Sequence, residues 1–140
     1  MNSMASLAFV LPLTPGKTQE WRHWGEEILG PRRSEYEAFR RRLGLRTLRW
    51  YLQHTPQGDQ AIIYLAGEDL QRTFQELQMS QDTFAVWLRQ QAKDLLDGFD
   101  LTQTSLESLS KLVFDGSNLE GVEASDYLRQ EMERFGTVSP

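Results

Sequence analysis

The chain has 140 residues, of which 39% are hydrophobic and 25% charged, a composition typical of a folded globular domain and not of a disordered chain. Its formal net charge is −5, and this acidity disfavours nucleic acid and anionic membranes as partners, because both attract basic surfaces. The absence of cysteine excludes disulfides, thiolate nucleophiles and cysteine-based metal sites, and we expect a cytoplasmic protein.

The first third of the chain predicts a strand followed by a long helix. Residues 5–13 form an apolar run whose two alternating faces are both hydrophobic, which is typical of an interior strand. The apolar stripe of a helix follows; it is interrupted at Gly30-Pro31 and ends at Gly44, so we expect one long kinked helix. Its predicted buried positions are Trp21, Trp24, Ile28, Tyr36, Phe39 and Leu43.

A β-hairpin is predicted next, from two runs rich in β-branched and aromatic residues. The runs are Leu45–Thr55 and residues 60–67, and four turn-forming residues at 56–59 lie between them. If the turn occupies all four residues, Tyr51 lies opposite Tyr64 on the neighbouring strand.

The two faces of this hairpin differ in character, because side chains alternate across a strand. One face is apolar and is predicted to pack in the core: Leu48, Trp50, Leu52, His54, Ala61, Ile63 and Leu65. The other combines aromatic rings with polar groups: Thr47, Arg49, Tyr51, Gln53, Ile62, Tyr64 and Ala66.

The rest of the chain predicts two helices, a last strand and a terminal helix. Asp69 lies at the start of the first helix, and Ser80 is expected to cap the second, which ends at Gly98. A polar connection leads to residues 109–115, whose Leu-Val-Phe run predicts a fourth strand. Residues 123–135 have the apolar spacing of a short amphipathic helix.

This order of elements, β-α-β-β-α-β, predicts an α+β fold with a ferredoxin-like core: a four-stranded antiparallel sheet with helices on one face. We expect a single domain over residues 1–140, with a core at 5–115 and a C-terminal helical extension at 116–140. The other face of such a sheet carries aromatic surface that needs a cover. A second copy of the sheet would provide it, so we expect a homodimer formed through the sheet face.

Several of these segments resemble the dimeric α/β-barrel superfamily. The resemblance covers residues 5–115 and rests on Pro15-Gly16-Lys17 after the first strand, the hairpin, Phe84-x-x-Trp87, and Gly98-Phe99-Asp100-Leu101. The chain is most similar to a small branch whose members have no assigned activity and which is related in fold to antibiotic-biosynthesis monooxygenases. The resemblance implies a dimer that packs sheet against sheet and encloses a pocket in each protomer.

The remaining motifs predict no cofactor and no metal site. His23 and His54 are the only histidines, and they lack the His-x-His or His-x3-His spacing of metal ligands. Gly16-Lys17-Thr18 matches the end of a phosphate-binding loop, but Leu11 stands where that loop needs its first glycine. The four tryptophans are predicted to pack in the core, and the basic run at 40–42 to lie on a salt-bridged helix surface.

Arg49, Tyr51 and Tyr64 form the candidate ligand-binding site. They share the mixed face of the hairpin, where one guanidinium and two phenols could hold a small acidic or aromatic compound. The alternative is that the same residues form a polar dimer interface.

The function expected from the sequence is that of a small-ligand-binding or structural homodimer with a possible small organic ligand. The alternative is a cofactor-independent monooxygenase or isomerase that acts on a small aromatic or acidic compound in the sheet-face pocket. No catalytic residue is assigned by the sequence for either function.

Overall fold

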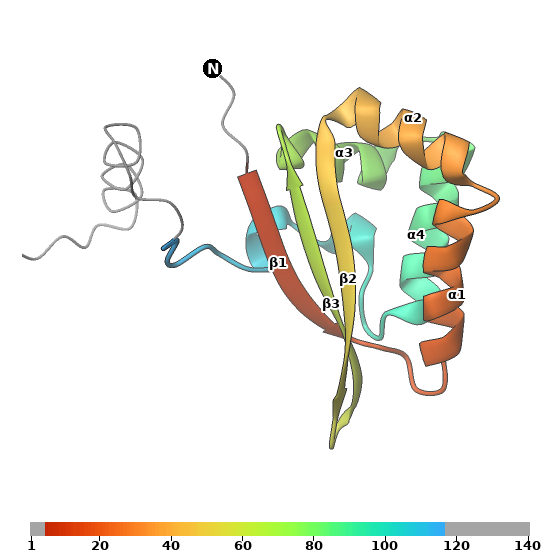
Figure 1. Ribbon diagram of the computed structural model, residues 1–140, viewed down its shortest axis with the longest axis vertical. Coiled ribbons are helices and arrows are strands. Elements are labelled where there is room, and N and C mark those ends of the chain that lie inside the picture. Colours follow the sequence, from red (N-terminus) through yellow and green to blue (C-terminus); the bar gives the residue numbers. More distant parts are fainter. Residues whose placement is uncertain (1–4, 117–140) are drawn as a thin grey trace, which may run out of the picture. The chain divides into compact units, whose positions relative to one another are not determined.

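The computed structural model describes residues 5–116 of the chain. These residues form an α+β fold with an antiparallel sheet of three strands and four α-helices. The chain divides into two compact units, Met1–Ser110 and Lys111–Pro140. The sheet and the helices belong to the first unit, and there they form two layers (Figure 1). The expected single domain stays a prediction.

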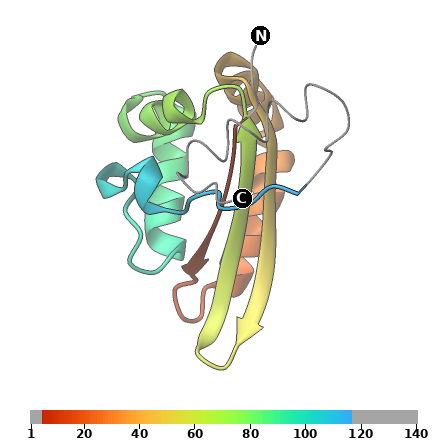
Figure 2. The same cartoon turned by 90° about the vertical axis from the view of Figure 1, so that its left-hand side faces the viewer.

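The sheet has the strand order β1-β3-β2, with both pairs of neighbours antiparallel. The strands are β1 (Ala5–Pro12), β2 (Leu45–Thr55) and β3 (Gly58–Gly67). Within the described part of the chain β1 pairs only with β3. It is therefore an edge strand there, and not the interior strand that the sequence predicts. The hairpin of β2 and β3 is the longest part of the sheet, and its turn extends past the end of β1 (Figure 2).

The predicted register of the hairpin is wrong by two residues, whereas the predicted faces are confirmed except at His54, whose side chain is 75% exposed because the hairpin turn extends past the core. The turn is shorter than expected, since Thr55 lies opposite Gly58, whose φ of 127° suits glycine. Tyr64 therefore lies opposite Arg49, and Tyr51 lies opposite Ile62. A shift of two residues leaves every side chain on its original face, because the strand repeats every two residues.

Two separate helices replace the single kinked helix that the sequence predicts. They are α1 (Thr18–Leu29) and α2 (Arg33–Leu43), and a turn at residues 30–32 separates them. The predicted apolar stripe is confirmed, with Tyr36 only partly buried and the other five positions buried. Gly44 ends α2 with a φ of 69°, a left-handed conformation that glycine adopts without strain.

Helices α3 (Leu70–Met79) and α4 (Thr83–Leu95) follow the hairpin. Asp69 caps α3 through a hydrogen bond from the Arg72 amide at 3.0 Å, as acidic residues at a helix N-terminus should. The expected Ser80 cap of α4 is wrong, because the Asp82 side chain accepts the bond from the Phe84 amide.

The expected fourth strand is not formed in the described residues. Two short 3-10 helices, Leu101–Gln103 and Leu106–Ser108, are followed by residues 109–116 without regular secondary structure. Val113 and Phe114 are about four-fifths exposed, at 79% and 80%. A run of consecutive apolar residues places side chains on both faces and so gives a weaker strand signal than strict alternation. The predicted helix at 123–135 lies outside the described residues.

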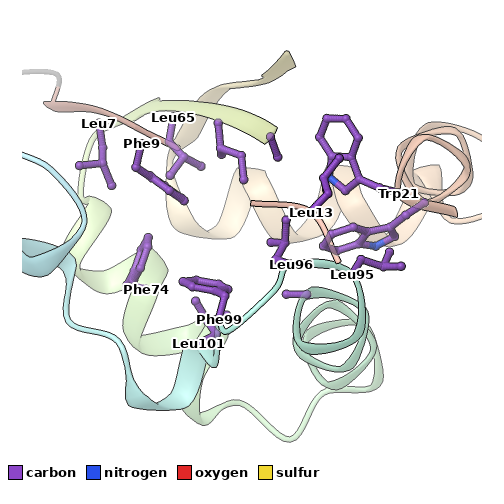
Figure 3. Close-up of a cluster of buried hydrophobic side chains, with 14 of the residues drawn as sticks. Leu7, Phe9, Leu13, Trp21, Leu65, Phe74, Leu95, Leu96, Phe99 and Leu101 are labelled. Atoms are coloured by element: carbon purple, nitrogen blue, oxygen red, sulfur yellow. The ribbon is translucent and has the colours of Figure 1, made fainter. Parts of the chain in front are cut away.

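The core lies between the sheet and the helices. Phe9 and Leu65 extend from the sheet toward Phe74 and Phe99 on the helical side (Figure 3). The apolar hairpin face thus packs on the helices, and the mixed face points the other way.

Candidate functional site

The predicted site residues Arg49, Tyr51 and Tyr64 lie on the mixed face, as expected from their spacing. The structure brings two of them together: the Arg49 guanidinium carbon lies 6.0 Å from the centroid of the Tyr64 ring. Tyr51 is 53% exposed and lies opposite Ile62. Among residues 5–116 no carboxylate oxygen lies within 4.0 Å of the Arg49 side chain. These three residues line none of the cavities described below.

A concave site lies on the other side of the sheet, between α1, α2 and the edge strand β2. This cavity, here called the vestibule, has a volume of about 440 Å³. Helix α1 contributes Trp21, Arg22, Gly25, Glu26, Ile28 and Leu29 to its wall. Strand β2 contributes Leu48, Trp50 and Leu52, and α2 contributes Tyr36. Its wall is therefore mainly apolar and aromatic, with two charged residues on one helix.

The Trp50 side chain is the centre of this wall and is fixed by two other indoles. Its ring stacks on Trp21, with centroids 5.4 Å apart and planes 18° apart, and lies 4.8 Å from the Trp24 ring. Helix α1 approaches Trp50 at Gly25, where an added Cβ would lie 3.3 Å from the Trp50 ring. Glycine inside a helix costs about 1 kcal/mol relative to alanine, so Gly25 marks a position where close approach matters.

A second cavity, here called the inner chamber, adjoins the vestibule inside the core. It has a volume of about 110 Å³ and shares Ile28, Tyr36, Leu48 and Trp50 with the vestibule. The rest of its wall is almost wholly apolar and includes Phe9, Phe39, Ile63, Phe74, Leu77 and Leu88. The Thr73 hydroxyl is a polar exception, and it already donates to the Asp69 carbonyl at 3.0 Å. A buried water needs two to four polar partners, so such a chamber favours an apolar occupant.

Two polar atoms of the aromatic residues are buried without a hydrogen-bond partner within residues 5–116. The Trp21 and Trp24 indole nitrogens are buried without an acceptor. Protein atoms cover both nitrogens, so neither faces the open space of a cavity. The partly buried Tyr36 lines both cavities, and burial raises the pKa of its phenol above the ordinary value of 10.0. Tyr36 is thus a neutral hydroxyl at the boundary between the two cavities.

The histidines do not form a metal site in the described part of the chain, where no cluster of three ligands is present. His54 pairs with Asp59 at the hairpin turn, with 2.6 Å between Nδ1 and Oδ1. The other Asp59 oxygen accepts a hydrogen bond from the Thr18 hydroxyl at 2.7 Å. This contact and the His54 contact hold the pKa of the Asp59 carboxyl below its usual value of 3.8. The arrangement connects the hairpin turn to the first residue of α1.

The basic run on α2 is largely salt-bridged, as the sequence predicts. Arg40 pairs with Glu37 at 3.0 Å, and Arg42 pairs with Glu76 at 2.6 Å. Exposed ion pairs of this kind contribute little stability.

The vestibule and the inner chamber were not predicted from the sequence. The sequence predicts most of their wall residues to pack in the core, and the one local indication of a cavity is Gly25 within the helical stripe between Trp21 and Ile28. The positions of three indoles relative to one edge strand depend on packing between elements, which local spacing does not specify.

Among the described residues no helix is long and apolar enough to cross a membrane. Comparison of the chain with protein-family models, with curated proteins and with solved structures finds no match of any of the three kinds.

Proposed function

We propose that this protein is a cytoplasmic small-ligand-binding protein whose vestibule receives a small, largely apolar organic molecule. The observation that carries the proposal is the apolar, tryptophan-walled cavity of about 440 Å³ between α1 and β2. This volume falls within the range of about 300–1,000 Å³ that is usual for small-molecule sites. The cysteine-free composition supports the cytoplasmic location.

The wall of the vestibule supports binding and not only packing. Trp50, Leu48 and Leu52 are only partly buried although they belong to the apolar face of the hairpin. A ligand that covers them gains about 25 cal/mol for each Å² of apolar surface removed from water. The stacked Trp21 ring and the tilted Trp24 ring hold Trp50 in place, so binding does not require the wall to be ordered first.

Binding is tested with 1-hexanol, which is apolar for most of its length and transparent where tryptophan absorbs. Tryptophan fluorescence and the thermal midpoint of the full chain are measured against alcohol concentration. Leu52→Trp, which fills the vestibule, is expected to weaken binding at least tenfold. Met79→Trp places the same side chain at a 74% exposed position that lines neither cavity, and is expected to leave binding unchanged. Equal binding by wild type and Leu52→Trp would contradict the proposal.

A second part of the proposal concerns the opposite face of the sheet, which we propose as the homodimer interface. Val10 and Tyr51 are about half-exposed there, at 50% and 53%, and an apolar aromatic surface of this kind favours a protein cover. Arg49 and Tyr64 lie on the same face, where they would contribute to the interface or bind a small carboxylate. Light scattering should give the mass of a dimer, and Tyr51→Asp should shift it toward the monomer. A monomer at tens of micromolar wild-type protein would overturn this part.

The fold proposal is the ferredoxin-like arrangement, in which a fourth strand pairs with the outer edge of β1. The strand order β1-β3-β2 supports it, because the outer edge of β1 is unpaired within the described residues. An unpaired edge is a template for another strand. Amide hydrogen exchange tests it: the outward-facing amides of β1 should be protected in the full chain, and rapid exchange at all of them would contradict it.

A further inference from the structure

The two cavities differ in size and polarity, and the ligand should match that difference. The vestibule wall includes the charged Arg22 and Glu26 together with Tyr36, whereas the wall of the inner chamber is apolar apart from Thr73 and Tyr36. Ile28, Tyr36, Leu48 and Trp50 belong to both walls. A molecule in the vestibule therefore lies directly against the side chains that border the inner chamber.

We infer that the bound molecule is amphipathic, with a slender apolar group in the inner chamber and a hydrogen-bonding end in the vestibule beside Tyr36. This inference rests on the proposed function of the vestibule. It adds the class of ligand, a compound with one alkyl or small aryl group and one hydroxyl, carbonyl or carboxylate group.

The size of the inner chamber limits the apolar group. Its volume of about 110 Å³ is somewhat smaller than an engineered apolar cavity of about 150 Å³ that stays dry and binds benzene. A linear alkyl chain or a group slightly smaller than a benzene ring fits this space. A fused aromatic ring system does not, so the ligand's larger part must stay in the vestibule.

The Tyr36 hydroxyl is suited to the polar end. Tyr36 is partly buried and lines the vestibule, and no hydrogen bond within residues 5–116 uses its hydroxyl, so that group is left to bond with a ligand oxygen. The raised pKa keeps the phenol protonated near neutral pH, so it can both donate and accept.

The test uses linear alcohols from 1-butanol to 1-decanol with the full chain, and binding is followed by tryptophan fluorescence. Each buried methylene contributes about 0.8 kcal/mol, so affinity should rise about fourfold per carbon until the chamber is full and then level off. Leu77→Phe narrows only the inner chamber and should make the affinity level off at a shorter chain. Leu52→Phe, the matched control, lines only the vestibule and should leave the point of levelling unchanged.

Tyr36→Phe separates the polar contact from the apolar one. It should weaken every alcohol by about the same factor, roughly fivefold, without changing the dependence on chain length. Leu88→Phe serves in place of Leu77→Phe if that variant does not fold, because Leu88 also lines only the inner chamber.

The outcomes distinguish the two proposals. If no alcohol binds, the function proposed for the vestibule fails and the amphipathic ligand fails with it. If alcohols bind with an affinity that does not depend on chain length, or if filling the inner chamber leaves the levelling point unchanged, the vestibule stands and the two-part ligand is overturned.

Discussion

The two faces of the sheet differ in the space that lies against them. The face toward the helices is apolar, yet it leaves a vestibule and an inner chamber around Trp50. The opposite face carries Arg49, Tyr51 and Tyr64, and these residues line neither of those cavities. Polar and aromatic groups on an open strand face thus resemble a ligand site in sequence, whereas the concave space is lined by residues that resemble ordinary core.

The largest expected difference between the faces concerns stability. Phe9 and Val10 are adjacent on β1 but point to opposite faces, and they are 8% and 50% exposed. Phe9→Ala should lower the free energy of unfolding by about 3–5 kcal/mol, because it leaves a cavity in the core. Val10→Ala should cost less than about 1 kcal/mol in the monomer. Chemical denaturation measures both, and similar losses would mean that the faces are not distinct.

A smaller effect is expected at the hairpin turn, which keeps the two faces in register. Gly58 has a φ of 127°, and an added Cβ there would meet no atom within 4 Å, so the cost of a side chain is one of backbone conformation. Gly58→Ala should destabilise the protein by about 1–3 kcal/mol. Gln57→Ala, at the exposed neighbouring position, should change stability by less than about 0.5 kcal/mol. A neutral Gly58→Ala would indicate a different turn.

The smallest predicted effect is a dependence on pH at the same turn. The contacts from Thr18 and His54 lower the pKa of Asp59 in the folded protein below its usual value of 3.8. Asp59 therefore stabilises the fold above pH 3.8, and this contribution is lost as the pH falls from there through the lower folded-state pKa. The effect is small because the carboxyl is screened by solvent. Asp59→Asn should flatten the fall in thermal midpoint between about pH 6 and pH 2, and an unchanged slope would contradict the assignment.

The sequence predicts most of the elements and both faces of the hairpin, because those depend on local spacing. The predicted register of the hairpin is two residues off. A two-residue turn and a four-residue turn both leave each side chain on the same face of the sheet, so the alternation of apolar residues does not distinguish them. The sequence pattern also joins α1 and α2 into one helix, because their apolar stripes remain in phase across Gly30-Pro31.

The candidate site was harder to predict than the fold for a physical reason. Trp21, Trp24 and Trp50 have the spacing of core residues, and the Trp50 ring does pack against the other two. A cavity is space that three elements fail to fill, so it depends on their relative placement and not on the pattern of any one of them. Polar groups on a strand, such as Arg49 and the two tyrosines, are visible in a sequence, whereas an unfilled volume is not.

The most direct test of the central claim is an NMR titration of the full chain with 1-hexanol that follows aromatic side-chain signals on both faces. The ring signals of Trp50 and Trp21 should shift with alcohol concentration, while those of Tyr51 and Tyr64 should not. Shifts confined to Tyr51 and Tyr64 would place the ligand on the opposite face, and the absence of any saturable shift at Trp50 would contradict a binding cavity between α1 and β2.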